Sequence, residues 1–264
     1  MTGVADTSVM LRRAQFRAAD APNQCAAIAR QIIAGKIQNS RNSLLRASRE
    51  TENPNEQQQL DTAIKALAQE INELTRQNDT NSIRGTEGMA STHYFGVFSL
   101  LFKKQRDNFL FTTRNRRPPR DRINCLLSFL YALVRHDCIA ALTTAGLDPF
   151  VGFLHVDRAN RPSLALDIME EFRPWLADRL AITLINRQQI SQTHFNQREG
   201  GAVEFTDTGR KLVIKAYQER KQEKLNHPLL DQNLRIAQLP FVQARVLARY
   251  LRGDIPAYIP FIPK

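Results

Sequence analysis

The chain has 264 residues, with 37 lysines and arginines against 26 aspartates and glutamates and a formal net charge of +11. Hydrophobic residues make up 42% and charged residues 24%, which excludes a disordered or fibrous protein. The length is enough to bury a sizeable core in one large domain or two small ones. The positive charge favours a polyanionic partner, either nucleic acid or an anionic membrane surface.

Neither a targeting segment nor a disulfide framework is indicated. No apolar stretch precedes Arg12 and Arg13, so we expect no signal peptide. The longest apolar run, at about residues 126–134, is far shorter than the roughly 20 residues of a membrane span. The chain has three cysteines and no CxxC pair. We therefore expect no disulfides, no zinc knuckle and a cytoplasmic location.

Helical periodicity dominates the N-terminal third. Apolar residues recur at spacings near three, four and seven over residues 28–45, which predicts helix through the first fifty residues. Polar residues 51–59 predict a connection. The next apolar residues form a short a/d seam. They are Leu60, Ile64, Leu67, Ile71 and Leu74. Two heptads are too few for a lasting coiled coil, so we expect an antiparallel hairpin with the preceding helix.

Small residues distinguish a third helix, predicted over about residues 82–102. Gly85 and Gly88 each cost ~1 kcal/mol relative to alanine in a helix, which suggests that another backbone or a ligand approaches there. The segment RNRRPPRDR (residues 114–122) cannot be continuous helix because of its two prolines. A buried helix is predicted from residue 121 to about 145.

The remaining elements are also mainly helical. A loop, LDPFVGFLHVDRANRPS, leads to a helix with Ser163 as its expected N-cap, and Pro174 should kink or end this helix. The single predicted hairpin covers residues 192–206, and helices follow over 206–224 and 229–251. The tail, residues 255–264, should be extended because of its three prolines. We expect a mainly α catalytic domain, residues 1–254, with a small β-hairpin, and a proline-rich tail at 255–264.

Carboxylates cluster in the helix after the loop. Asp167 and Glu170 are three residues apart and therefore share a helix face, with Glu171 adjacent. One interpretation is a solvated acidic face paired with Arg173 or Arg179. The apolar neighbours favour another, in which the carboxylates are partly buried and need a metal or a paired base.

Two further residues are weak candidates when taken alone. His155 lies in the apolar loop, where a histidine is more often a structural hydrogen-bonding group, and Glu87 lies between the two glycines of RGTEG. An oxygen-rich site with one histidine suits Mn²⁺ or Mg²⁺ better than zinc. The five arginines of residues 114–122 suit phosphate contacts, although a solvated basic loop is an equally good interpretation.

Four ordered blocks give these residues a common context. They are IARQIIAGKIQNSRNSLLR, IRGTEGMASTHYF, NRRPPRDRINCLLSFLYALV and LDPFVGFLHVDRANRPSLALDIMEEFRP. Together, over about residues 28–174, they closely resemble the CRISPR-associated protein one family, the integrase-endonucleases of spacer acquisition. The amino-acid sequence of these blocks is most similar to the subtype I-C form of the family.

The resemblance implies a site and its cofactor. It places the divalent-metal ligands and catalytic residues at Glu87, His155 and Glu170, with Asp167 as a further candidate ligand and Glu171 not excluded. The implied cofactor is Mn²⁺ or Mg²⁺. We assign DNA contacts to basic residues of the second block and of the segment RNRRPPRDR (residues 114–122). These are Arg84, Arg114, Arg116, Arg117 and Arg120.

The resemblance also implies a reaction and partners. The family joins the 3′-hydroxyl of a short DNA fragment to a phosphodiester at the CRISPR leader-repeat boundary, and a metal clamp would align and stabilise the reacting oxygens. Double-stranded and branched DNA, CRISPR-associated protein two and a second copy of the chain are the expected partners.

One departure from the family pattern concerns the N-terminus. Family members usually begin with a small β-rich domain that contributes to dimerisation and docking, and this sequence begins almost at the block that follows it. We expect that domain to be absent, by natural truncation, a misplaced start codon or design. The alternatives to an active integrase are a DNA-binding remnant without catalysis and a helical scaffold that binds an adaptation protein through the a/d seam or the tail.

Overall fold

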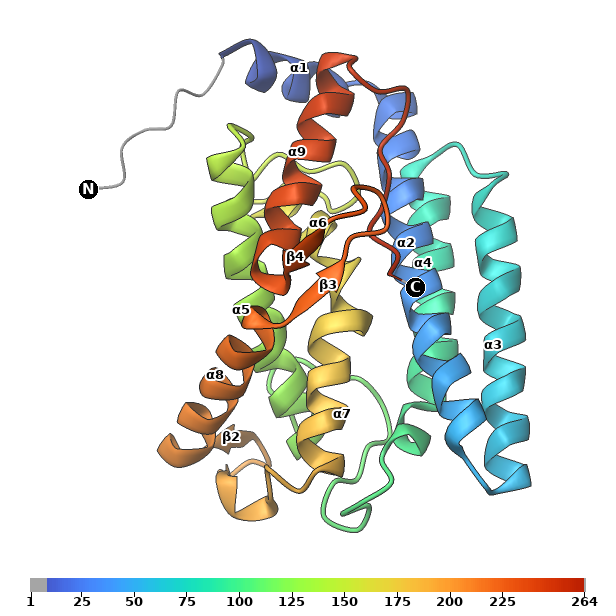
Figure 1. Ribbon diagram of the computed structural model, residues 1–264, viewed down its shortest axis with the longest axis vertical. Coiled ribbons are helices and arrows are strands. Elements are labelled where there is room, and N and C mark those ends of the chain that lie inside the picture. Colours follow the sequence, from blue (N-terminus) through green and yellow to red (C-terminus); the bar gives the residue numbers. More distant parts are fainter. Residues whose placement is uncertain (1–8, 264) are drawn as a thin grey trace.

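The computed structural model describes residues 9–263, which fold into a mainly α structure as predicted (Figure 1). Helices α2 (Pro22–Glu50), α3 (Pro54–Leu74) and α4 (Thr80–Gly96) contact one another and form one layer. Helices α5 (Arg122–Thr144), α6 (Ser163–Met169), α7 (Arg179–Asn186) and α9 (Leu239–Arg252) form the other. Helix α1 (Val9–Ala19) packs against α2 and α9. The site described below lies where α2 meets α6.

The a/d seam is the inner face of the first layer. Leu60, Leu67 and Leu74 are each at most 1% exposed, and α3 contacts both α2 and α4. The predicted antiparallel hairpin of α2 and α3 is therefore confirmed (Figure 1). The predicted connection over 51–59 is too long, because α3 already begins at Pro54. Proline suits the first helical position, and the Asn53 side chain accepts hydrogen bonds from the next backbone amides.

Helix α4 ends earlier than predicted. It stops at Gly96 and is followed by a 3-10 turn, η1 (Phe98–Leu101). Phe98 is fully buried and meets Phe102 and Phe111 in edge-to-face contacts, so aromatic packing turns the chain inward. Gly85 and Gly88 of this helix are not required by close packing within the chain, because a Cβ at either position would meet nothing within 4 Å.

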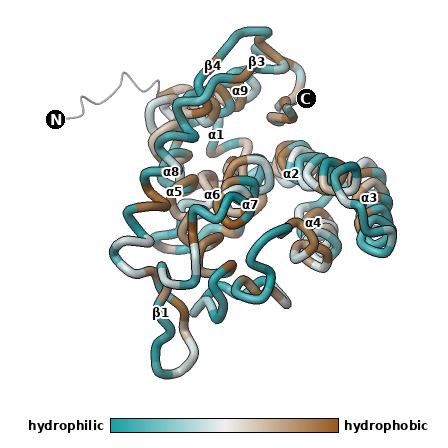
Figure 2. Tube along the Cα trace, turned by 60° about the horizontal axis from the view of Figure 1, so that its bottom comes forward, coloured by the Kyte–Doolittle hydropathy of each residue, from teal (hydrophilic) through white to brown (hydrophobic). Residues whose placement is uncertain are grey.

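Helix α5 is the central helix of the second layer. Asp121 caps it by accepting a hydrogen bond from the Asn124 amide, and eleven of its residues are buried. By length and composition alone it is the one described helix that could cross a membrane. Its contacts with α6, α9 and β2 instead place it in the protein core. Figure 2, a Cα trace coloured by hydropathy, shows hydrophobic stretches around α5, α6 and α7.

Pro174 does interrupt the helix that follows the loop. The segment Arg173–Asp178, η2, is π-helical and joins α6 to α7. Proline has no amide hydrogen to donate to the preceding turn, which explains the irregular geometry. Ser163 is not the N-cap of α6 as predicted. Pro162 occupies that position without a side-chain cap, and Ser163 is the first helical residue.

The structure contains two small antiparallel hairpins rather than one. The predicted hairpin pairs β1 (Phe195–Gln197) with β2 (Val203–Phe205), and α8 (Asp207–Gln222) follows it. The second pairs β3 (Lys224–Asn226) with β4 (Asn233–Arg235), where helix was predicted from residue 229. Strands β3 and β4 each contain a single apolar residue, which is too few to show the alternation that predicts a strand. A 3-10 turn, η4 (Ile236–Gln238), leads to α9.

Residues 255–263 of the C-terminal tail form neither helix nor strand and bend at 255–257, and the tail is part of the core. Tyr258 and Phe261 are 2% and 1% exposed. In Figure 1 the chain end lies beside α2, next to the β3–β4 hairpin. All three cysteines are buried and free, in agreement with the expectation of no disulfides.

The buried seam generates a stability prediction. Leu67→Ala should lower the free energy of unfolding by about 2–5 kcal/mol, because it leaves a cavity between α2, α3 and α4. Lys65→Ala, at an exposed position of the same helix, should change it by less than about 0.5 kcal/mol. Urea unfolding measures both. Equal stabilities of the two variants would mean that the seam is not core.

Candidate active site

Four elements bring the predicted site residues together. Glu87 lies on α4, Glu170 follows α6, and His155 lies in the loop before α6. The ammonium group of Lys36, on α2, hydrogen-bonds Oε1 of Glu87 and lies 2.7 Å from Oε2 of Glu170. Glu170 is 2% exposed and Lys36 is 8% exposed. A single cation thus bridges two carboxylates that would otherwise repel each other.

Asp167 orients the histidine. Its carboxylate accepts hydrogen bonds from the backbone amides of Phe153, Leu154 and His155, at 2.7, 3.1 and 3.0 Å. It also lies 2.7 Å from Nδ1 of His155. With Nδ1 held in this way, Nε2 faces the site and lies 3.8 Å from Oε1 of Glu170. Asp167 therefore acts on the site through His155, in the manner of a carboxylate that orients a metal-binding imidazole.

The charges around Glu170 keep it ionised in spite of its burial. Burial opposes ionisation, but Arg173, Lys36 and His155 together lower the pKa of Glu170 to about 2. Arg173 contributes directly, since its guanidinium lies 3.1 Å from Oε1. At Glu87 burial again opposes ionisation, yet the ammonium of Lys36 gives a lowered pKa. Both carboxylates are therefore anionic at neutral pH, as ligands of a hard cation must be.

The donor set fits a divalent cation, although the site is not arranged as a finished metal cage. No group of three or more His, Cys, Asp or Glu side chains within residues 9–263 is already placed to hold a metal. Lys36 occupies the space between the carboxylates. Oε2 of Glu170 accepts no hydrogen bond of acceptable geometry, including from Lys36, and so keeps an unused acceptor. Two carboxylates and an imidazole suit Mn²⁺ or Mg²⁺.

Sequence reasoning missed one member of the site and named another only as a neutralising partner. Lys36 was not singled out, although a charged residue beside Ile32, Ile33 and Ile37 on a buried stripe is the signal that could have found it. Arg173 does pair with Glu170, but the face is buried and not solvated. Of the two interpretations of this acidic face, the partly buried one is confirmed.

Glu171 points away from the site. Its carboxylate accepts hydrogen bonds from Gln243, Tyr258 and the Phe261 amide, at 2.9, 2.6 and 2.8 Å. These partners lie on α9 and in the C-terminal tail. Glu171 thus links the tail to the turn that carries Glu170 and does not join the candidate ligands.

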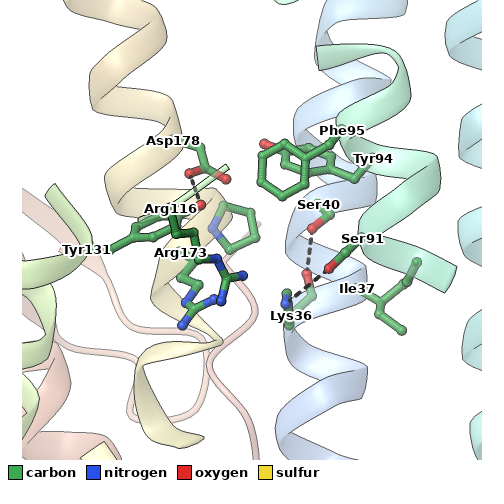
Figure 3. A pocket seen from close by; sticks show the side chains of 12 residues that line it. Lys36, Ile37, Ser40, Ser91, Tyr94, Phe95, Arg116, Tyr131, Arg173 and Asp178 are labelled. Atoms are coloured by element: carbon green, nitrogen blue, oxygen red, sulfur yellow. Dashed lines mark hydrogen bonds between the residues drawn. The ribbon is translucent and has the colours of Figure 1, made fainter. Parts of the chain in front are cut away.

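A basic and aromatic pocket opens beside the carboxylates. Its cavity has a volume of about 20 Å³, room for about one water molecule. Figure 3 shows Arg116 and Arg173 opposite Lys36 and Ser91, with Tyr131 and Asp178 on the side of the arginines. The Tyr131 hydroxyl donates to Asp178 at 2.7 Å. The two guanidinium groups and the ammonium can contact an anion next to the carboxylates.

The five predicted DNA-contacting arginines differ in their surroundings. Arg114 is held inside the fold by Asn124 and Ser128, at 2.6 and 3.0 Å. Arg84 donates to the carbonyl of Leu154 at 2.8 Å and so supports the loop that carries His155. The remaining three, Arg116, Arg117 and Arg120, are exposed on the loop before α5. They are the members of the set that are open to a phosphate, and their role stays a prediction.

The pKa of Glu171 generates a pH prediction. Burial raises it from 4.5 to about 8, so the folded protein keeps this carboxyl protonated at neutral pH. Its stabilising contribution is complete below about pH 4.5 and is lost as the pH rises towards 8. Relative to Glu171→Gln, the wild type should therefore lose up to about 1.4 kcal/mol of unfolding free energy per pH unit. Urea titrations of both proteins at pH 5 to 8 measure this, and parallel curves would contradict it.

Known proteins resemble this chain over nearly its whole length. The family model described as CRISPR associated protein Cas1 matches residues 1–219. The CRISPR-associated endonuclease Cas1 1 of Moorella thermoacetica is 48% identical over 98% of this chain and 76% of that protein. The CRISPR-associated endonuclease Cas1 of Leptospira interrogans is also 48% identical, over 97% of this chain and 100% of that protein.

Solved structures share the fold. A casposase bound to its integration product superposes with a TM-score of 0.83 at 25% identity, covering 96% of this chain and 71% of that one. A CAS1 protein from Thermotoga maritima superposes with a TM-score of 0.80 at 24% identity, covering 99% of this chain and 76% of that one. The family model over residues 1–219 and the relatives that are 48% identical to this chain establish that the chain belongs to the Cas1 family.

Proposed function

We propose that this chain is a divalent-metal-dependent DNA integrase and endonuclease of CRISPR adaptation, which joins the 3′-hydroxyl ends of spacer DNA into the CRISPR array. The observation that carries the proposal is the pairing of the buried Glu170 and the partly buried Glu87 carboxylates beside the oriented imidazole of His155, at the edge of a basic pocket. The relatives named as endonucleases and the casposase bound to an integration product support it.

The residues have distinct tasks in this mechanism. Glu87, His155 and Glu170 would hold Mn²⁺ or Mg²⁺, and the ion would stabilise developing charge on the phosphodiester oxygens. Asp167 keeps Nε2 of His155 facing the site. Arg173 balances the charge of Glu170. Lys36 holds the carboxylates together before the substrate arrives, and its ammonium can then neutralise a phosphate oxygen. No covalent protein nucleophile is needed.

The proposed partners follow from the charge and the relatives. The exposed Arg116, Arg117 and Arg120 would contact the backbone of double-stranded or branched DNA. A solved complex named Cas6-RT-Cas1–Cas2 has a TM-score of 0.83 to this chain at 26% identity, which supports CRISPR-associated protein two as a partner. A homodimer, as in the full-length family, and a cytoplasmic location complete the proposal.

A remnant that binds DNA without catalysis is the alternative, and a scaffold is less well supported. The apolar seam of α3 and the side chains of Tyr258 and Phe261 in the tail are buried within the chain, so these side chains are not free for a partner protein. The remnant shares the basic surface of the integrase. Product formation is therefore the measurement that separates the two.

Metal binding generates the first functional prediction. Mn²⁺ at a hundredfold excess over its Kd should stabilise the protein by about 2.7 kcal/mol, seen as a rise in Tm. Glu87→Ala and His155→Ala should each remove that rise, because they remove candidate ligands. Differential scanning fluorimetry with and without Mn²⁺ measures it. The same rise in both variants would refute the assignment of the site.

Lys36→Met should affect the rise in Tm on adding Mn²⁺ in the opposite direction. Loss of the ammonium leaves the partly buried Glu87 carboxylate without its cation and the buried Glu170 paired with Arg173 alone, so the metal-free Tm should fall, by the equivalent of up to about 3 kcal/mol. The rise on adding Mn²⁺ should then exceed that of the wild type. Lys65→Met, at an exposed position on α3, should behave as the wild type.

DNA joining generates the second functional prediction. With Mn²⁺ and a duplex bearing free 3′-hydroxyl ends, the wild type should give joined or cleaved branched-DNA products, and Glu170→Gln should give none. Arg116→Ala with Arg117→Ala should weaken DNA binding and lower the salt slope by about 0.9 for each lost phosphate contact. Lys65→Ala is the control. Salt-dependent DNA binding without product in the wild type would favour the remnant.

A further inference from the structure

The C-terminal strap (residues 258–261) contacts α2 directly behind the candidate active site. The side-chain amide of Asn39 donates to the carbonyl of Phe261 at 2.9 Å and to the carbonyl of Glu171 at 2.9 Å. One turn earlier, a Cβ on Gly35 would lie only 2.7 Å from Cβ of Pro260. Gly35 and Asn39 flank Lys36, the residue that bridges the two site carboxylates. The strap is therefore seated against the segment of α2 that carries the bridging ammonium.

The same strap holds the turn that carries Glu170. The carboxyl group of the neighbouring Glu171 accepts the Phe261 amide at 2.8 Å and the Tyr258 hydroxyl at 2.6 Å. Gln243 of α9 donates to Glu171 at 2.9 Å and to the Tyr258 hydroxyl at 2.9 Å, which closes a buried network. Every side chain of this network is at most 2% exposed. Asn39 adds the link from this network to α2.

The chain needs this external support because its own helix is interrupted at the site. Glu170 and Glu171 lie in a turn between α6 and the π-helical η2. Pro174 has no amide hydrogen to donate to the carbonyl of Glu170, four residues earlier, so one bond of the regular ladder is missing at this turn. The neighbouring Glu171 carbonyl accepts a hydrogen bond from Asn39 of α2.

Aromatic packing keeps the strap in place. The Phe261 ring stacks on Phe172 with centroids 5.7 Å apart and meets Trp175 edge-on at 5.2 Å. Phe172 and Trp175 flank Pro174, so the ring covers the irregular part of the helix. This contact buries apolar surface on both sides and gives the strap a stable seat.

We propose that the C-terminal strap, through Asn39 and Glu171, is a positioning element that sets the separation between Lys36 and Glu87 on one side of the site and Glu170 and His155 on the other. The proposal deepens the proposed function, since it rests on those residues forming the metal-binding centre. None of the strap residues would touch the metal or the DNA. Their effect would be on the geometry of the carboxylates and hence on metal affinity.

A distance measurement on the metal-free protein tests the geometry without relying on metal binding. Spin labels at Met89→Cys and Val156→Cys, two exposed positions beside Glu87 and His155, report the separation, and the native cysteines are buried. Asn39→Ala and Glu171→Ala should broaden or shift the distance distribution. Glu171→Gln should retain the wild-type distribution, because its amide oxygen can accept the Phe261 amide and its amide nitrogen can donate to the Tyr258 hydroxyl. Val213→Ala, a core change in α8, controls for general destabilisation.

The same proteins without labels give a second readout. Asn39→Ala and Glu171→Ala should raise the Mn²⁺ concentration for half of the maximal Tm rise by about tenfold. Glu171→Gln and Val213→Ala should stay within about twofold of the wild type. If Glu171→Ala does not fold, Tyr258→Phe, which removes one hydroxyl, should shift both readouts in the same direction by less.

The outcomes separate this proposal from the proposed function. Unchanged distance distributions in Asn39→Ala and Glu171→Ala would overturn the positioning role, whatever the metal response. Equal changes in Val213→Ala would overturn it too, because the strap would then be merely structural. A wild type without any Mn²⁺ response would refute the metal site, while broadened distances in the strap variants alone would still support the role of the strap in positioning.

Discussion

The charge balance at Lys36 is the interaction on which the site depends. Glu87 and Glu170 come from different helices, and both are substantially buried near each other. Two buried anions at this separation are tolerable only with a cation between them. The ammonium of Lys36 supplies that cation in the metal-free protein, and Arg173 supports it at Glu170. The arrangement keeps both carboxylates ionised in spite of their burial.

The two helical layers contribute opposite halves of the site. The first layer provides Lys36 and Glu87, and the second provides His155 and Glu170. Within the second layer the half-site is rigid, because Asp167 holds the His155 loop through four contacts. The alignment of the two halves depends on contacts between the layers. This explains why buried polar groups, which are costly elsewhere, gather at this boundary.

Much of the helical framework could be predicted from local signals. The a/d seam identified α3, and Asp121 with the apolar run after it identified α5. Glycines 200 and 201 marked the first hairpin. The second hairpin could not be predicted in this way, because Leu225 and Leu234 are the only apolar residues of its short strands. The helix predicted from residue 229 begins only at Leu239, because the β3–β4 hairpin and the 3-10 turn η4 precede it.

The sequence by itself identified four residues of the candidate site: Glu87, His155, Asp167 and Glu170 stand in motif blocks with a recognisable family resemblance. Only the tertiary structure added Lys36 and decided the roles. Asp167 orients the histidine, and Lys36 bridges the carboxylates. The bridge depends on Lys36 meeting Glu170, which is more than a hundred residues away in the chain. Periodicity reports the buried face of one helix, but it does not report which charge on another helix faces it.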